Sequence, residues 1–103
     1  MNNLRKTTKD NKEKVIKEAN EIYKEISEHM NKGFSPSSKE VQLLIKKHHA
    51  FANQFHISNK DVYKALAEVY LKIPEFRDQL DHFHPKLSEF MSKAMVIFAE
   101  KNL

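Results

Sequence analysis

The sequence contains no cysteine and no tryptophan, and the first absence removes several kinds of site at once. Without cysteine there is no disulfide, no thiolate metal ligand and no cysteine nucleophile, so stability must come from noncovalent packing. No stretch approaches the run of about 20 apolar residues that a membrane-spanning helix needs. The charged segment from Met1 to Lys17 also lacks the apolar centre of a signal peptide. We therefore expect a cytoplasmic protein with no membrane partner.

Glycine and proline are scarce, and their positions divide the chain. The one glycine and the three prolines all fall between runs of apolar residues that repeat every three or four positions. This period is typical of helices, and no segment shows the alternation of a strand. Hydrophobic residues make up 40% of the 103 residues, which suffices for one core. We expect one domain spanning residues 1–103, with residues 1–9 either a frayed end or a linker helix.

The apolar period predicts five helices that each bury one face. The residues of these faces are, in chain order, Val15, Ile16, Ala19, Ile22, Tyr23, Ile26 and Met30; Val41, Leu44, Ile45, His48, Phe51 or Ala52, and Phe55; Val62, Leu66, Val69, Tyr70 and Ile73; Phe76, Leu80 and Phe83; and Leu87, Phe90, Met91, Ala94, Ile97 and Phe98. Since amphipathic helices can only bury such faces against one another, the sequence predicts an all-α fold. Periodicity leaves two arrangements open, an orthogonal helical bundle and a globin-like fold.

Local signals predict where the helices begin and end. Gly33 should end the first helix in a left-handed conformation, because glycine adopts it without steric cost. The second helix should be capped by Ser35 or by Ser37, and the third by Ser58. Pro74 opens a short fourth helix over residues 75–83.

The charge balance argues against nucleic acid as a partner. There are 18 lysines and arginines against 14 acidic residues, a formal charge of +4, and both signs are mixed along the chain. The densest basic stretch, Lys9 to Lys17, also contains Asp10 and Glu13, and is typical of a solvated helix face. We expect no direct contact with nucleic acid, which would need one sign gathered on one surface.

From Gly33 onward, a set of residues in fixed order and spacing carries a resemblance to a known family. They are Gly33; Ser37, Lys39, Glu40, Val41, Gln42 and Leu44; His48; Tyr63, Leu66, Ala67 and Tyr70; Phe76 and Asp81; and Leu87, Phe90, Ala94 and Ala99. In these positions the chain resembles the TipAS antibiotic-recognition domain of MerR-type multidrug regulators. The resemblance implies a globin-like helical domain whose deep cleft binds bulky, apolar antibiotics such as thiopeptides. In the regulators, ligand occupancy is transmitted to an N-terminal winged-helix domain.

Several positions depart from the family pattern. The family has an aromatic residue where this chain has Val15, an acidic cap where it has Ile73, and glycine where Lys86 follows Pro85. Some members trap their ligand on a cysteine, and this chain has none. Any antibiotic should therefore be bound noncovalently.

Aromatic side chains and one histidine are the candidate ligand-binding residues, because apolar pockets are lined by rings with a few polar groups. They are His48, Phe51, Phe55, Tyr63, Tyr70, Phe76, Phe83 and Phe90. Apolar residues at helical spacing normally face the core, and periodicity does not separate that role from a cleft wall. Tyr63 and Tyr70, seven residues apart on one helix face, rank highest because their hydroxyls need partners. For His48 the alternatives are a histidine satisfied within the core and one that points into a cavity.

The sequence shows no pattern that favours catalysis or a bound cofactor. No nucleophile has an evident base, no glycine-rich phosphate loop is present, and the histidines lack the spacing of a metal site. Glu75, Asp78 and Asp81 are predicted to be solvent-facing charges near a helix start. We expect a non-enzymatic protein without cofactor or metal.

Three functions follow as hypotheses. The first is antibiotic binding, in a free-standing sequestering domain or in the effector-sensing part of a longer regulator that supplies the DNA-binding domain. The second is a helical module that receives a partner helix without any small molecule. The third and weakest is a basic nucleic-acid binder. The oligomeric state stays open.

Overall fold

The computed structural model describes residues 2–54 and 59–103, with side chains from residue 13 onward. The helices are α1 (Asn2–Asn31), α2 (Lys39–Ala52), α3 (Lys60–Lys72), α4 (Pro74–Asp81) and α5 (Leu87–Asn102). No strand occurs among the described residues. The predicted all-α fold with five helices is therefore confirmed.

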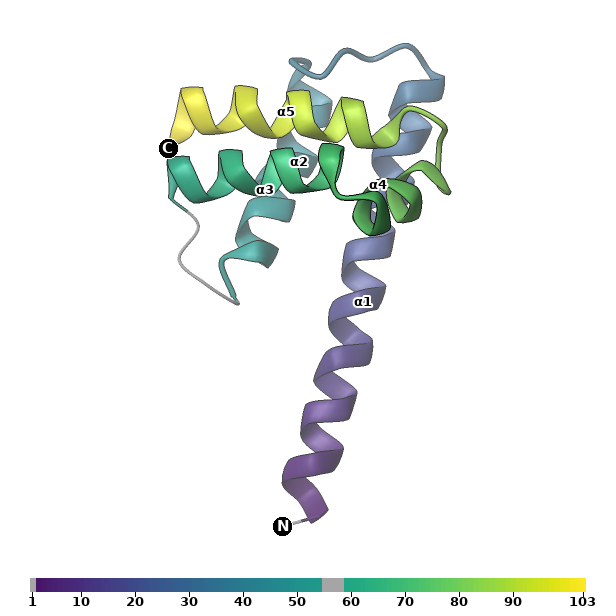
Figure 1. The fold of residues 1–103 in the computed structure, drawn as a ribbon, viewed down its shortest axis with the longest axis vertical. Helices are drawn as coiled ribbons and strands as arrows, with labels where there is room; N and C mark the ends of the chain where they lie inside the picture. Colours follow the sequence, from purple (N-terminus) through teal and green to yellow (C-terminus); the bar gives the residue numbers. More distant parts are fainter. Residues whose placement is uncertain (1, 55–58) are drawn as a thin grey trace.

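Two pairs of helices form the body of the molecule. Helix α1 packs against α2, and α3 packs against α5, while α4 closes one end against both α3 and α5. The α3 and α5 helices run side by side in opposite directions, and the α1 and α2 pair crosses them steeply (Figure 1). The steep crossing of the two pairs is common to both arrangements that periodicity left open, the orthogonal bundle and the globin-like fold.

Helix α1 is much longer than the others and extends beyond the bundle. Its 30 residues correspond to about 45 Å of helix, close to the molecule's longest dimension of 48 Å. The N-terminal half projects away from the other helices (Figure 1). Residues 2–9 are helical. The sequence had left both a frayed end and a linker helix possible for this segment.

Gly33 ends α1 as predicted. Its φ of +88° lies in the left-handed region, which only glycine enters without steric cost. The Gly33 amide donates to Met30 O and the Phe34 amide donates to His29 O, at 3.0 and 3.1 Å. This pair of bonds is the Schellman motif. The rings of His29 and Phe34 pack together beside it, with their centres 5.0 Å apart.

The cap of α2 is Ser38, so the prediction of Ser35 or Ser37 is wrong. The Ser38 amide donates to Ser35 O at 3.1 Å, which closes a turn before the helix begins. The Ser38 hydroxyl then accepts from the Val41 amide at 3.4 Å. Ser35 and Ser37 bond to each other through their hydroxyls. Each of these serines could cap a helix. The turn closed by the Ser38 amide determines that Ser38 is the cap.

The cap of α3 is Asn59, whose Oδ1 accepts from the Val62 amide at 2.9 Å. Ser58, the predicted cap, lies outside the described residues. Asparagine caps helices as well as serine does. The helix starts one residue later than a Ser58 cap would have given.

The buried face of α3 also differs from the predicted one. Val62 and Ile73 are exposed, and the buried residues are Tyr63, Ala67 and Tyr70. The small Ala67 is buried between the two tyrosines in the sequence of α3, the helix that packs against α5. Leu66 and Val69 pack at the margin of the core.

The predicted faces of α1, α2 and α5 are largely buried as expected. The core consists of Ile22, Tyr23, Ile26, Val41, Leu44, Ile45, Ala52, Tyr63, Ala67, Tyr70, Leu80, Leu87, Met91, Ala94, Met95, Phe98 and Ala99. In α1 the burial begins at Ile22, whereas Ile16 is 49% exposed. On α2 the buried alternative is Ala52, with Phe51 half-buried beside it.

Asp81 does not face solvent near a helix start, which corrects the prediction made for it. It is the last residue of α4, and its Oδ1 accepts from the Ser88 amide at 2.9 Å. Its other oxygen lies 3.7 Å from Arg77 Nε. Asp81 therefore supplies the acceptor that the first turn of α5 needs, since Lys86 at the N-cap makes no side-chain bond. Glu75 and Asp78 are exposed as predicted.

Candidate functional site

A buried cluster of hydroxyls and one imidazole lies where α1, α2 and α3 meet. His48 Nδ1 lies 2.7 Å from the Tyr63 hydroxyl, and His48 Nε2 lies 3.1 Å from the Tyr70 hydroxyl. The Tyr70 hydroxyl is also 3.1 Å from that of Tyr23. All four residues are buried. The three helices are thus joined through one chain of hydrogen bonds.

Burial keeps this cluster uncharged. It lowers the pKa of His48 to about 4, and the neighbouring His49 adds a smaller effect of the same sign. Burial also raises the pKa of Tyr63, of Tyr70 and of Tyr23 above the ordinary tyrosine value. At neutral pH the cluster therefore holds a neutral imidazole and three phenols.

The hydrogen-bond pattern leaves His48 no capacity for a substrate. A neutral imidazole has one N–H donor and one acceptor nitrogen. One of Tyr63 and Tyr70 therefore donates to His48, and the other accepts from it. Both ring nitrogens are occupied in either tautomer. The cluster can hold three helices in register, and it offers no free base. His48 is thus a histidine satisfied within the core, although its partners are tyrosine hydroxyls.

From this cluster, aromatic rings continue to the surface in two directions. The Phe83 ring lies 5.8 Å from that of Tyr23, and the Phe76 ring lies 6.1 Å from that of Tyr70. Phe83 is half-buried and Phe76 is 43% exposed. The series Phe83, Tyr23, Tyr70 and Phe76 thus connects two surface rings through the core.

A groove lies along α1 beside Phe83. It has a volume of about 490 Å³ and is lined by Glu13, Ile16, Lys17, Asn20, Glu21, Lys24 and Phe83. Exposed Ile16 and the Phe83 ring supply its apolar surface, and opposite charges form its rim. Its size is within the range of small-molecule sites, about 300 to 1,000 Å³.

The predicted site residues occupy different environments. His48, Tyr63 and Tyr70 are buried together, and half-buried Phe51 lies 6.3 Å from the His48 ring. Phe90 is half-buried in a separate hollow of about 330 Å³ that Met30 also lines. Phe55 lies outside the described residues.

Tyr23 belongs to the cluster but was absent from the predicted site. The sequence placed it on the apolar face of the first helix. The available signal was its hydroxyl, because a tyrosine on a buried face needs a hydrogen-bond partner. That partner, Tyr70, is 47 positions away in the sequence.

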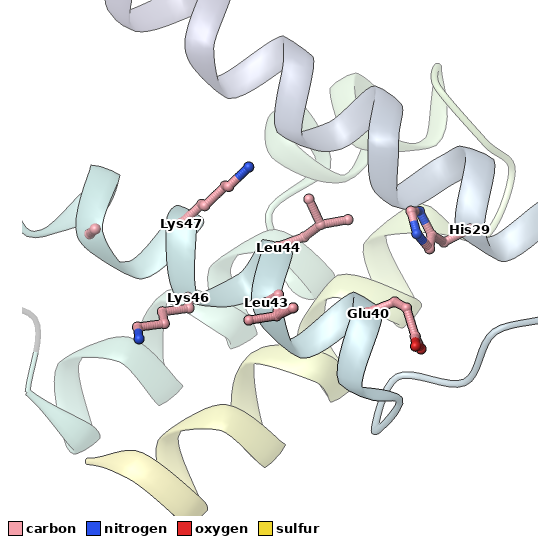
Figure 2. A pocket seen from close by; sticks show the side chains of 7 residues that line it. His29, Glu40, Leu43, Leu44, Lys46 and Lys47 are labelled. Atoms are coloured by element: carbon pink, nitrogen blue, oxygen red, sulfur yellow. The ribbon is translucent and has the colours of Figure 1, made fainter.

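A second groove lies on the other side of α1, between it and α2. It has a volume of about 610 Å³ and is lined by His29, Glu40, Leu43, Leu44, Lys46, Lys47 and Ala50. Figure 2 shows Leu43 and Leu44 at its centre and the charged side chains around them.

The described part of the chain contains neither a metal-ligand cluster nor a helix suited to a membrane. No group of three or more potential ligands is placed to hold a metal ion there. None of the described helices combines the length and the apolar character that crossing a bilayer requires.

Comparison with known proteins identifies the family. The family model described as the TipAS antibiotic-recognition domain matches residues 1–98, and the chain belongs to this family. A curated relative is the HTH-type transcriptional activator mta of Bacillus subtilis (strain 168), 25% identical over 87 residues. These cover 84% of this chain and 33% of the relative, so the chain spans about a third of that protein's length. No solved structure matches. The resemblance drawn from Gly33 onward is confirmed, and the match also includes the first helix.

Proposed function

We propose that this chain binds bulky, largely apolar antibiotics noncovalently, as the effector-sensing part of a MerR-type regulator. The observation that carries the proposal is the match of residues 1–98 to the antibiotic-recognition family. The relative named as a transcriptional activator favours the sensing role over a free-standing sequestering domain. In this proposal residues 1–103 act as one cytoplasmic recognition domain, and DNA binding is supplied by another part of the regulator.

The groove of Ile16 and Phe83 is the ligand site that the geometry supports best. It combines an exposed aliphatic side chain with a half-buried ring whose position is fixed by contact with Tyr23. Flat heterocycles of a thiopeptide would stack on Phe83. Tyr70 and His48 would support this wall from behind, since both are buried and hydrogen-bonded. With no cysteine in the chain, binding is noncovalent.

Helix α1 would connect this site to the rest of a regulator. Residues of α1 from Glu13 to Lys24 line the groove, and the same helix runs on beyond the bundle (Figure 1). A ligand seated between α1 and Phe83 would add contacts to the half of the helix that has few of its own. Ligand binding would therefore favour one orientation of α1 over others. A ligand can drive a conformational switch only if it binds one conformation more tightly than the other.

The test is a thermal-shift screen of the chain against thiopeptides and other bulky antibiotics. A ligand present at about 100 times its dissociation constant adds about 2.7 kcal/mol to the free energy of unfolding, a shift of several degrees for a domain of this size. Ile16→Glu should abolish the shift without lowering the melting temperature of the free chain, because Ile16 makes little contact with the core. Leu43→Glu, in the second groove, is the matched control and should keep the full shift.

Either of two results would contradict the proposal. No shift with any antibiotic of the panel would favour a module that binds a partner helix. A shift that survives Ile16→Glu and Phe83→Ala would place the ligand elsewhere in the chain.

A further inference from the structure

Phe90 lies apart from the proposed antibiotic site, in a hollow between the end of α1 and the start of α5. The Phe90 hollow, as we call it, has a volume of about 330 Å³ and is lined by Met30, Pro36, Lys86, Glu89, Phe90 and Lys93. The Phe90 ring is half-buried and packs against the core. Met30 and Pro36 are also half-buried. The hollow therefore has an apolar floor that includes one aromatic ring.

The rim of the Phe90 hollow carries more positive than negative charge. Lys86, Glu89 and Lys93 are exposed, and Glu89 is the one acidic residue in the lining. Lys86 stands four positions before Phe90 and Lys93 three positions after it, spacings that place side chains on the same side of a helix. None of the ion pairs between described residues includes either lysine. Both lysines can therefore turn their flexible side chains toward a ligand on the Phe90 ring.

One amide side chain holds two walls of this hollow together. Gln42 Nε2 donates to Pro36 O at 2.7 Å and to Ala94 O at 3.1 Å. Pro36 forms one wall, and Ala94 directly follows Lys93 in α5. Gln42 therefore fixes the loop between α1 and α2 against α5 independently of any ligand. A site with walls fixed in advance loses less of its binding free energy to ordering.

We propose that the Phe90 hollow is a second ligand site, which binds a small aromatic carboxylate. The ring of the ligand stacks on Phe90 and contacts the Met30 thioether. The carboxylate lies between Lys86 and Lys93, which supply the opposite charge. A volume at the low end of the range for ligand pockets suits a molecule much smaller than a thiopeptide.

This site is separate from the proposed antibiotic site. None of the side chains that line the groove of Ile16 and Phe83 also lines the Phe90 hollow. The two proposals can therefore fail independently. Ile16→Glu, which should abolish the thermal shift with antibiotics, should leave the binding of an aromatic carboxylate unchanged.

Titration calorimetry of the native chain with matched probes separates the contribution of the ring from that of the charge. Naphthoate carries both, protonated naphthylmethylamine carries the same ring with the opposite charge, and acetate carries the carboxylate without a ring. We expect naphthoate to bind with a dissociation constant on the order of 0.1 to 1 mM, and more weakly as salt is raised. The other two probes should bind at least about tenfold more weakly. In NMR spectra, naphthoate should shift the amide signals of Met30 and Phe90.

Charge variants of the rim should change the affinity for naphthoate in opposite directions. Lys86→Gln with Lys93→Gln should weaken binding about tenfold, because both positive charges are lost. Glu89→Gln should strengthen it about threefold, because the one carboxylate in the lining is removed. Lys72→Gln with Lys101→Gln is the matched control, since it removes the same charge from exposed positions outside the hollow. Circular dichroism should show that all the variants keep the helical content of the native chain.

Several results would overturn the proposal. One is the absence of saturable naphthoate binding, and another is equal affinity for naphthoate and naphthylmethylamine, since the lysines would then contribute nothing. A loss in the Lys86 and Lys93 variant no larger than that in the control would mean that only the overall charge matters. Amide shifts confined to the groove of Ile16 and Phe83 would place the ligand there.

Discussion

The two halves of α1 follow the same helical period but have different surroundings. In the C-terminal half, Ile22, Tyr23 and Ile26 are buried, and the Tyr23 hydroxyl reaches the cluster around His48. In the N-terminal half, Ile16 is exposed beside a groove, and the helix runs on past the bundle. A periodic apolar face therefore predicts that a helix forms, but it does not predict what covers that face. In the proposed function, the half that lacks cover is the one to which a bound ligand would add contacts.

The largest expected effect compares Ile26 and Ile16 directly. Ile26→Ala should lower the free energy of unfolding by about 3 to 4 kcal/mol, because a fully buried side chain is lost and a cavity remains. Ile16→Ala, ten positions earlier, should change it by less than about 0.5 kcal/mol. Urea denaturation of both variants gives the values. Equal losses would mean that the N-terminal half of α1 is covered in solution, and the contrast between the halves would be lost.

The presence of the helices was predictable from the sequence. Which of several similar residues caps a helix, or is buried in it, was not predictable. The period in residues 15–30 and Gly33 after it locate the C-terminal half of α1 and its end, because both depend only on neighbouring residues. Ser35, Ser37 and Ser38 offer the same cap, and the turn closed by the Ser38 amide selects the last of them. On α3, Val62 and Tyr63 both belong to helical stripes. Only packing against α5 decides that Tyr63 is the buried one.

The candidate site was predictable in part for the same reason. His48, Tyr63 and Tyr70 were named because polar groups on apolar faces need partners, and the structure brings those three together. The sequence did not predict that these three residues bond to one another. Those bonds depend on how α2 crosses α3, and no local sequence pattern determines that crossing. The grooves along α1 are also invisible in sequence, since their walls come from segments distant in the chain.

The second expected effect is a pH dependence that originates in His48, in the buried cluster that the C-terminal half of α1 contacts. The unfolded chain binds a proton at His48 below a pKa of about 6.5, and the folded chain binds it only below about 4. The unfolded state therefore holds more protons between these values. The contribution of neutral His48 is complete above about pH 6.5 and is lost as the pH falls toward 4, by about 3 kcal/mol in all.

Denaturation curves at several pH values between 7 and 4 would measure this loss, with His48→Gln as the control. The variant should be less stable at pH 7, and its further loss on acidification should be smaller by about 3 kcal/mol. Parallel profiles for the native chain and for His48→Gln would mean that His48 is not the group responsible.

The smallest expected effect concerns the bond that joins α1 to the cluster. Tyr70→Phe removes one hydroxyl that contacts both His48 Nε2 and the Tyr23 hydroxyl, so two buried groups lose a partner. Tyr63→Phe leaves only His48 Nδ1 without its partner. We expect losses of about 2 and about 1 kcal/mol respectively, measured by urea denaturation. The rings remain in both variants, so the difference isolates the hydroxyls. A larger loss for Tyr63→Phe would mean that the 2.7 Å bond to His48 outweighs the two longer ones. The cluster would then mainly stabilise the crossing of α2 with α3, and α1 would be held by the packing of its apolar face.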